Sequence, residues 1–220
     1  MDIVTGVGVL DKAVHVLRAV ADGPLSLGGL HAATGLPRAT AHRLAVALET
    51  HGLLRRDEEG RFDLGPELAS LGRSAAERFP LAGLALPLMD DLRQETQESV
   101  QLFVREGSHR RCVVSLQSPH ALRWIVPEGV LFPLDVGSAG RVLSTADADG
   151  LGWIASVEER EAGVASVSAP VLDGDRTLLA AVSVSGPIDR LTRDPGQQFG
   201  QAVVDAAAAI SARWDARGGD

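Results

Sequence analysis

The sequence predicts an α+β protein made of two parts that differ in construction. Residues 8–65 combine three short helical patterns with a tight hairpin, whereas residues 99–116 and 163–185 alternate apolar and polar residues as strands do. An alanine-rich helical pattern over about 195–214 closes the chain. We therefore expect a winged helix-turn-helix over 1–65, a linker helix over 66–80 and an α/β domain with an antiparallel sheet over 81–220.

Composition places the chain among folded proteins. Its 220 residues suit two domains of ordinary size, and a hydrophobic content of 45% is enough for a core in each. There is no run of eighteen apolar residues, and residues 1–6 lack the basic and then apolar layout of a signal peptide. We expect a cytoplasmic protein.

Helical spacing of apolar residues predicts a first helix over 8–22, which Asp22-Gly23-Pro24 ends. A second, shorter helix follows and carries Leu27, Leu30 and Ala33. The turn Gly35-Leu36-Pro37 then leads into a third helix over 38–51. Its predicted buried side consists of Leu44, Val46, Ala47 and Leu48. Two helices joined in this way form a helix-turn-helix pattern.

The third helix has the polar start of a recognition helix. Pro37 occupies a position where the first helical turn tolerates a missing N–H. The opening turns carry Arg38, Thr40, His42 and Arg43. In helix-turn-helix proteins this end of the second helix meets the base edges of DNA.

A basic hairpin follows the third helix directly. Residues 53–57 and 61–64 read as two short strands around a Glu58-Glu59-Gly60 turn, flanked by Arg55, Arg56 and Arg61. A helix-turn-helix followed by such a hairpin is a winged helix, which predicts binding to double-stranded DNA. The alternative is that these arginines belong to an ordinary solvated surface.

The net charge of −8 is distributed unevenly along the chain. Residues 1–65 hold seven basic and eight acidic side chains, whereas residues 81–220 hold twelve and nineteen. Residues 38–56 contain four arginines and one acid, Glu49, so a local basic footprint remains. We therefore expect modest, strongly salt-dependent affinity for non-specific DNA.

The linker helix is predicted over 66–78, with Pro80 ending it. Its narrow apolar stripe consists of Leu68, Leu71 and Ala75. Such a stripe needs a surface to cover it, which either the second domain or another copy of the chain must supply. We expect a homodimer, or a dimer of dimers, on a palindromic operator.

The C-terminal part begins with a predicted helix over 81–96 and a hairpin of strands over 99–105 and 110–116. Alternation of Val100, Leu102 and Val104 predicts that the first strand is half-buried. Residues 122–126 are a further candidate strand. The run 137–140 then opens a short helix over 141–145, whose unpaired N–H groups can hold an anion.

Serines alternate with apolar residues on two predicted strands, 163–171 and 178–185, which a turn at 173–175 joins. One face carries Ser166 and Ser168, and the corresponding face of the next strand carries Ser183 and Ser185. This pattern has two interpretations, a solvated sheet surface or the lining of a small polar pocket.

Neither a metal site nor enzymatic chemistry is expected, and no cofactor follows from the sequence. Cys112 stands alone between apolar residues and is interpreted as a buried inert thiol, and the six histidines lack metal-ligand spacing. The sequence contains no nucleophile elbow and no phosphate loop. Glu158, Glu159 and Glu161 flank a turn and are interpreted as solvated.

Several longer runs resemble the IclR family of transcriptional regulators. In the N-terminal part these are 8–13, 35–44 and 60–65, and in the C-terminal part 137–140, 152–153, Glu159, 163–171 and 181–187. The resemblance implies a DNA-binding repressor that responds to a small, often carboxylate-bearing effector. It is closest to the actinobacterial branch that controls amino-acid biosynthesis genes, which implies an amino acid or oxo-acid as effector.

The resemblance also implies which residues line the effector pocket. Carried over by motif, they are Ser138, Ala139, Gly140, Ser156, Val164, Ser166, Ser183 and Ser185. One departure lies at 145–151, where the family usually has a few dozen residues over the pocket. Either the lid is absent, or a segment is missing from this sequence. The competing non-enzymatic interpretation is a winged helix used for protein contacts alone, as a dimerisation module.

Overall fold

The structure, a computed structural model, describes residues 7–78, 80–145 and 150–217. The chain divides into two compact units, Met1–Arg78 and Phe79–Asp220, each with its own core. Within the described residues, no helix combines the length and the apolar composition that crossing a membrane requires.

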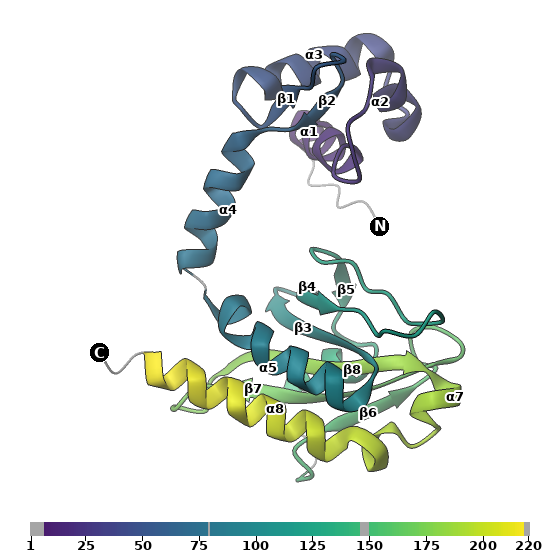
Figure 1. The fold of residues 1–220 in the computed structure, drawn as a ribbon, viewed down its shortest axis with the longest axis vertical. Coiled ribbons are helices and arrows are strands. Elements are labelled where there is room, and N and C mark those ends of the chain that lie inside the picture. The colour runs from purple at the N-terminus through teal and green to yellow at the C-terminus, as the bar shows by residue number, and fades with distance from the viewer. Residues whose placement is uncertain (1–6, 79, 146–149, 218–220) are drawn as a thin grey trace. The chain divides into compact units, whose positions relative to one another are not determined.

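The first unit contains α1 (Gly8–Ala19), α2 (Leu27–Thr34), α3 (Arg38–Thr50), the strands β1 (Leu54–Arg56) and β2 (Phe62–Leu64), and α4 (Pro66–Arg78) (Figure 1). Its core joins the three helices to the hairpin. The buried side chains are Val16, Val20, Leu30, Leu44, Ala45, Leu48, Leu54 and Phe62. Burying these apolar groups together fixes the position of α3 against α1, α2 and the hairpin.

Local signals set the turn between α2 and α3. Ser26 caps α2, because its hydroxyl accepts a hydrogen bond from the Gly29 N–H at 3.1 Å. Gly35 ends the helix in the left-handed region, with φ at 65°, where a residue without Cβ is favoured. Pro37 is the N-cap of α3, so the helix starts at Arg38 as predicted, and the Pro37 carbonyl accepts the N–H groups of Thr40 and Ala41.

The predicted buried side of α3 is partly wrong. The buried residues are Ala41, Leu44, Ala45 and Leu48, whereas Val46 is 37% exposed and Ala47 is also exposed. At 100° per residue, positions 46 and 47 turn away from the 41, 44, 45 and 48 stripe. One face of α3 is therefore left uncovered within its unit.

The hairpin is antiparallel, with Arg55 opposite Asp63 and Leu54 opposite Leu64. Leu25 adds an unpredicted bridge, in which it exchanges both backbone hydrogen bonds with Phe62 at 2.8 Å. This bridge closes the hairpin onto the chain that leads into α2.

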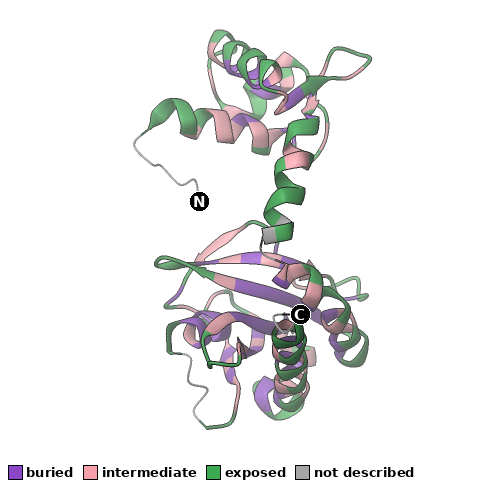
Figure 2. Cartoon of the chain, turned by 90° about the vertical axis from the view of Figure 1, so that its left-hand side faces the viewer, coloured by how far each residue is buried: buried purple, intermediate pink, exposed green. Residues whose placement is uncertain are grey.

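Helix α4 carries its apolar stripe largely in solvent. Leu68 is partly buried, but Leu71 is 54% exposed and Ala75 is exposed. Figure 2 shows exposed residues along most of the described length of α4. The covering surface that the sequence requires is therefore not supplied by this unit.

The second unit is built on a six-stranded antiparallel sheet in the order β5-β4-β3-β8-β7-β6. Its strands are β3 (Ser99–Glu106), β4 (His109–Leu116), β5 (Leu131–Pro133), β6 (Ile154–Val157), β7 (Val164–Leu172) and β8 (Leu178–Pro187). Its helices are α5 (Leu81–Thr96), α6 (Ser138–Thr145), α7 (Ile188–Leu191) and α8 (Pro195–Arg217).

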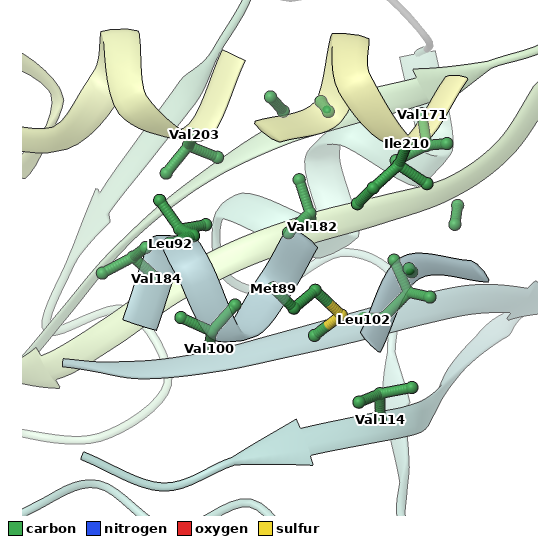
Figure 3. Close-up of a cluster of buried hydrophobic side chains, with 14 of the residues drawn as sticks. Met89, Leu92, Val100, Leu102, Val114, Val171, Val182, Val184, Val203 and Ile210 are labelled. Atoms are coloured by element: carbon green, nitrogen blue, oxygen red, sulfur yellow. The ribbon is translucent and has the colours of Figure 1, made fainter. Parts of the chain in front are cut away.

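Helices α5 and α8 lie side by side on one face of this sheet (Figure 1). Figure 3 shows Met89 and Leu92 of α5 and Val203 and Ile210 of α8 above apolar side chains of the strands, including Val182. These residues are all nearly inaccessible to solvent. The other face holds α6 and a second apolar cluster that includes Phe103 and Cys112.

Because both faces of the sheet are covered, the prediction of a half-buried β3 is wrong. Ser99, Gln101 and Phe103 are buried, as are Val100 and Leu102 on the opposite face. The alternation in β3 therefore separates an apolar layer from one that combines Ser99 and Gln101 with Phe103, and not the core from solvent.

Residues 122–126 do not form a strand, contrary to the prediction. Leu122 is 69% exposed and Ile125 is 49% exposed, while Pro127 removes a backbone donor at the end of the segment. The edge of β4 pairs instead with β5, where Arg110 lies opposite Phe132. Strands β5 and β6 were not predicted.

Candidate nucleic-acid interface and candidate effector pocket

The uncovered face of α3 presents two free cations. Arg38 and Arg43 are exposed, and among the described residues neither has an ion-pair partner. His42 is exposed beside them, and Thr40 is partly buried. A helix start with unpaired arginines on a rigid three-helix core is suited to contact phosphates and guanine edges.

The three arginines of the hairpin already have partners. Arg55 is paired with Asp63 at 2.5 Å, and Arg61 with Asp57 and Glu59 at 2.7 Å each. Arg56 is paired with Glu49 at 3.3 Å and lies over the Phe62 ring at 4.1 Å. Binding a phosphate through these side chains would compete with the internal pairs, so Arg38 and Arg43 are the more available of the arginines predicted to bind DNA.

The serine face of the sheet is buried, which excludes its interpretation as a solvated surface. Ser168, Ser183 and Ser185 are 0%, 2% and 4% exposed, and β6 adds Ser156 at 7%. Strand pairing places Ser156 opposite Ser166, which lies opposite Ser185. Long-range register therefore gathers hydroxyls from three neighbouring strands.

Helix α6 joins this hydroxyl network at its first residue. The Ser138 Oγ lies 2.7 Å from the Oγ of Ser166 and 2.8 Å from that of Ser168. Ser156 lies 2.9 Å from Ser166, and Ser168 donates to Ser183 at 2.9 Å. The helix begins at Ser138 and not at 141 as predicted, which brings its hydroxyl onto the sheet.

The start of α6 is already occupied by a carboxylate of the chain. The Gly137 N–H donates to Glu159 at 3.0 Å, and the same carboxylate pairs with Arg141 at 3.0 Å. Glu159 thus takes one donor beside this helix start, the Gly137 N–H, and the anion site at the N–H groups of the helix itself stays a prediction. Glu158, Glu159 and Glu161 are exposed, as interpreted, and Glu158 also accepts the Gly163 N–H and pairs with Arg193.

A small cavity opens between the sheet and α6. Seven of the eight predicted effector residues line it, namely Ser138, Ala139, Ser156, Val164, Ser166, Ser183 and Ser185. Gly140 lies just behind, where a Cβ would collide with the Arg110 guanidinium and the Leu134 carbonyl. The cavity volume is about 30 Å³, where one buried water needs roughly 10–15 Å³.

Five charged or polar lining residues were not predicted, namely Gln101, Arg110, Glu159, Arg160 and Glu161. Arg110 is 2% exposed, and burial, followed by the nearby charge of Arg160, lowers its pKa to about 10. Burial also lowers the pKa of Arg160, whose guanidinium lies 4.3 Å from the Phe132 ring centre. For Gln101 and Arg110, the only sequence signal of a pocket was a polar side chain within a predicted strand. The sequence does not show which strands lie beside them.

Cys112 lies on the same sheet face as Arg110 and is buried and free. Burial raises the pKa of its thiol to about 12, so the thiolate is scarce near neutral pH. This environment agrees with the interpretation of an inert side chain.

Comparison with known proteins places the whole chain in one family. The model of the IclR helix-turn-helix domain matches residues 9–58, and that of the IclR C-terminal domain matches 73–151 and 146–212. The two C-terminal stretches overlap at 146–151, within the short segment where the chain departs from the family pattern. Residues 146–149 of that segment lie outside those that the structure describes.

Curated relatives match over nearly their full length. The glycerol operon regulatory protein of Streptomyces griseus is 30% identical, covering 92% of this chain and 94% of that protein. The transcriptional repressor IclR of Escherichia coli is 26% identical, covering 92% and 88%.

Solved structures share the fold. An IclR homolog from Microbacterium hydrocarbonoxydans, complexed with 4-hydroxybenzoate, has a TM-score of 0.75 at 21% identity, covering 93% of this chain and 98% of that chain. The Thermotoga maritima IclR has a TM-score of 0.73 at 20% identity, covering 94% and 98%.

Proposed function

The chain belongs to the IclR family of DNA-binding transcriptional regulators, and we propose that it is a repressor whose operator affinity is changed by a small carboxylate effector. The observation that carries this proposal is the uncovered face of α3, which presents Arg38 and Arg43 without internal partners. Two proteins similar to this chain are named as repressors, from Escherichia coli and Salmonella typhimurium.

We propose that Arg38, Thr40, His42 and Arg43 contact the operator from α3. The residues Arg55, Arg56 and Arg61 would contribute phosphate contacts from the hairpin, at the expense of their internal pairs. A palindromic operator implies two copies of the chain, and the exposed stripe of α4 is the surface proposed to join them.

The effector pocket is proposed to be the cavity beneath α6. Its support is the convergence of five serines and a buried arginine on one small space. One structural neighbour was solved with 4-hydroxybenzoate, which carries a carboxylate. The narrow cavity favours a smaller acid, and we propose an amino acid or its oxo-acid.

The most specific part of the proposal is that the chain controls amino-acid biosynthesis genes. It is supported by the motif resemblance described above and by the size of the cavity. The relatives are named for other systems, among them a glycerol operon and an acetate operon. A thermal-shift screen of amino acids and oxo-acids tests it, because a ligand of the native state raises the melting temperature.

The alternative function is a winged helix that makes only protein contacts. An electrophoretic mobility shift at two salt concentrations separates the two. A DNA-binding regulator retards duplex DNA and loses affinity as salt rises, because phosphate contacts release counterions. Absence of any salt-dependent shift would favour the protein-contact module.

A further inference from the structure

We propose that Arg110, assisted by Gln101, is the group that recognises the carboxylate of the effector. This inference rests on the proposed function, because it assigns a role within the same pocket. It moves the anion-binding chemistry from the start of α6 to the strands β3 and β4.

Arg110 is a buried cation without a matching anion. Its Nη1 donates to the Pro133 carbonyl, its Nε has no partner, and among the described residues no carboxylate lies within ion-pair distance. Aromatic rings of Phe103 and Phe132 lie 5.5 Å and 5.4 Å from the guanidinium carbon. Ring faces stabilise a cation only in part, so a bound anion would supply the missing charge.

The position of this arginine is built into the fold. A Cβ at Gly140 would overlap Nη1 of Arg110, so a glycine in α6 leaves room for the guanidinium. The neighbouring Arg111 points to the other face of β4 and is paired with Glu106 at 2.5 Å. Of the two adjacent arginines, the one that is buried and lines the cavity has no carboxylate partner among the described residues, whereas the other is paired.

Gln101 supplies a second unused donor. It is 1% exposed and lines the same cavity, and its Oε1 accepts a hydrogen bond from Ser185 at 2.7 Å. Its Nε2 has no partner. Buried polar groups are nearly always hydrogen-bonded, so an amide donor left open beside a pocket indicates an acceptor that enters it.

The serine hydroxyls of the cavity are already hydrogen-bonded, to one another or to Gln101, and Glu159 takes the Gly137 N–H. Among the buried side-chain atoms of its described lining, those left without a partner are the Arg110 Nε and the Gln101 Nε2, both donors and one of them on a charged group. A planar carboxylate has the acceptors and the charge to match these donors.

The size of the cavity and the charges of its lining favour a monocarboxylate over other anions. The enclosed space suits a carboxylate group and not a large headgroup. The acids Glu159 and Glu161 also line the cavity and would repel a doubly charged phosphate more than a singly charged acid. The remainder of the ligand would extend past the serines toward these residues.

The test is isothermal titration calorimetry on the full chain with acetate, pyruvate and L-alanine, each matched by its amide, and with inorganic phosphate. We expect at least one acid to bind about tenfold or more tightly than its amide, because a charge-assisted hydrogen bond is lost with the charge. Arg110→Met should reduce binding of that acid by a similar factor, and Arg110→Lys by less. Arg111→Met is the matched control and should bind as the wild type does.

Equal binding of acid and amide, undiminished binding in a folded Arg110→Met variant, or no binding of any of the acids would overturn the proposal. Preferential binding of phosphate through Arg110 would also overturn it, because the recognised group would then be a phosphate and not a carboxylate. Circular dichroism checks that the variants fold. Gln101→Leu is a second variant, which should weaken binding of the acid while keeping the buried charge of Arg110. Duplex DNA binding by the same samples fails only if the proposed function is wrong, so the two failures are distinguishable.

Discussion

The hydroxyl of Ser185 donates a hydrogen bond to the Oε1 of Gln101 at 2.7 Å and so connects β8 to β3 beneath the cavity. The bond orients the Gln101 amide, leaving its Nε2 as an open donor. Ser183, two residues earlier on β8, accepts from Ser168 and continues the network toward α6. This pair of serines therefore holds the polar floor of the pocket in place.

Replacing Ser183 and Ser185 together by Val should abolish the ligand response and leave basal DNA binding intact. Valine fits a strand, but the change leaves the Gln101 Oε1 without its partner and removes one of the two hydroxyl contacts of Ser168, which keeps that with Ser138. Each unsatisfied buried group costs about 1–3 kcal/mol, so the melting temperature should also fall. Operator affinity with and without ligand is the measurement. A double variant that responds at the unchanged ligand concentration would place the effector elsewhere.

Arg43→Ala is expected to weaken specific operator binding by about 1–3 kcal/mol, the range for an arginine that pairs with guanine. Arg55→Ala should have a smaller effect, nearly equal for all sequences, because Arg55 is already paired with Asp63. Fluorescence anisotropy with operator and random duplexes compares the two variants. Unchanged operator affinity and salt slope in Arg43→Ala would show that α3 is not the DNA-reading helix.

Leu71→Glu is expected to weaken self-association. Leu71 is 54% exposed on the apolar stripe of α4, and placing a carboxylate there would oppose burial of that stripe between copies. Light scattering at micromolar concentration should show at least a dimer for the wild type and a smaller species for the variant. A monomeric wild type that protects a single half-site would rule out the dimer.

Gly196→Ala should destabilise the second unit. A Cβ at Gly196 in α8 would collide with the Trp153 ring that precedes β6. Such overpacking typically costs about 1–3 kcal/mol. Gly83→Ala in α5 is the control, because a Cβ there meets nothing within 4 Å and alanine favours the helix by up to about 1 kcal/mol. Chemical denaturation should move the two midpoints in opposite directions.

Elements with strong local signals were predictable from the sequence. The pattern from Gly8 to Gly65 contains its own turns and caps, so the three helices and the hairpin follow from neighbouring residues. The strands β7 and β8 are long and joined by a tight turn, and their serine alternation also identified one face of the pocket. In both cases residues close in sequence determine the structure.

Features that depend on distant pairing were not predictable. Strand β5 is three residues long and gains its partner, β4, only when the sheet forms. In the sequence, Arg110 looks like an ordinary charged residue of a hairpin, because its burial depends on β5 and α6, which lie over it only in the folded unit. Val46 followed an apolar pattern, yet nothing in its unit covers it, as suits a helix face that binds a partner.

Sequence-specific DNA binding is tested most directly by selection of random duplex DNA with the full chain, followed by affinity measurement at about 50 and 200 mM salt. We expect enrichment of a palindrome whose half-sites lie one helical turn, or a multiple of it, apart. The affinity of the protein for this site should fall by at least about tenfold over that salt range. Failure to enrich any sequence, with binding absent or independent of salt, would contradict sequence-specific DNA binding.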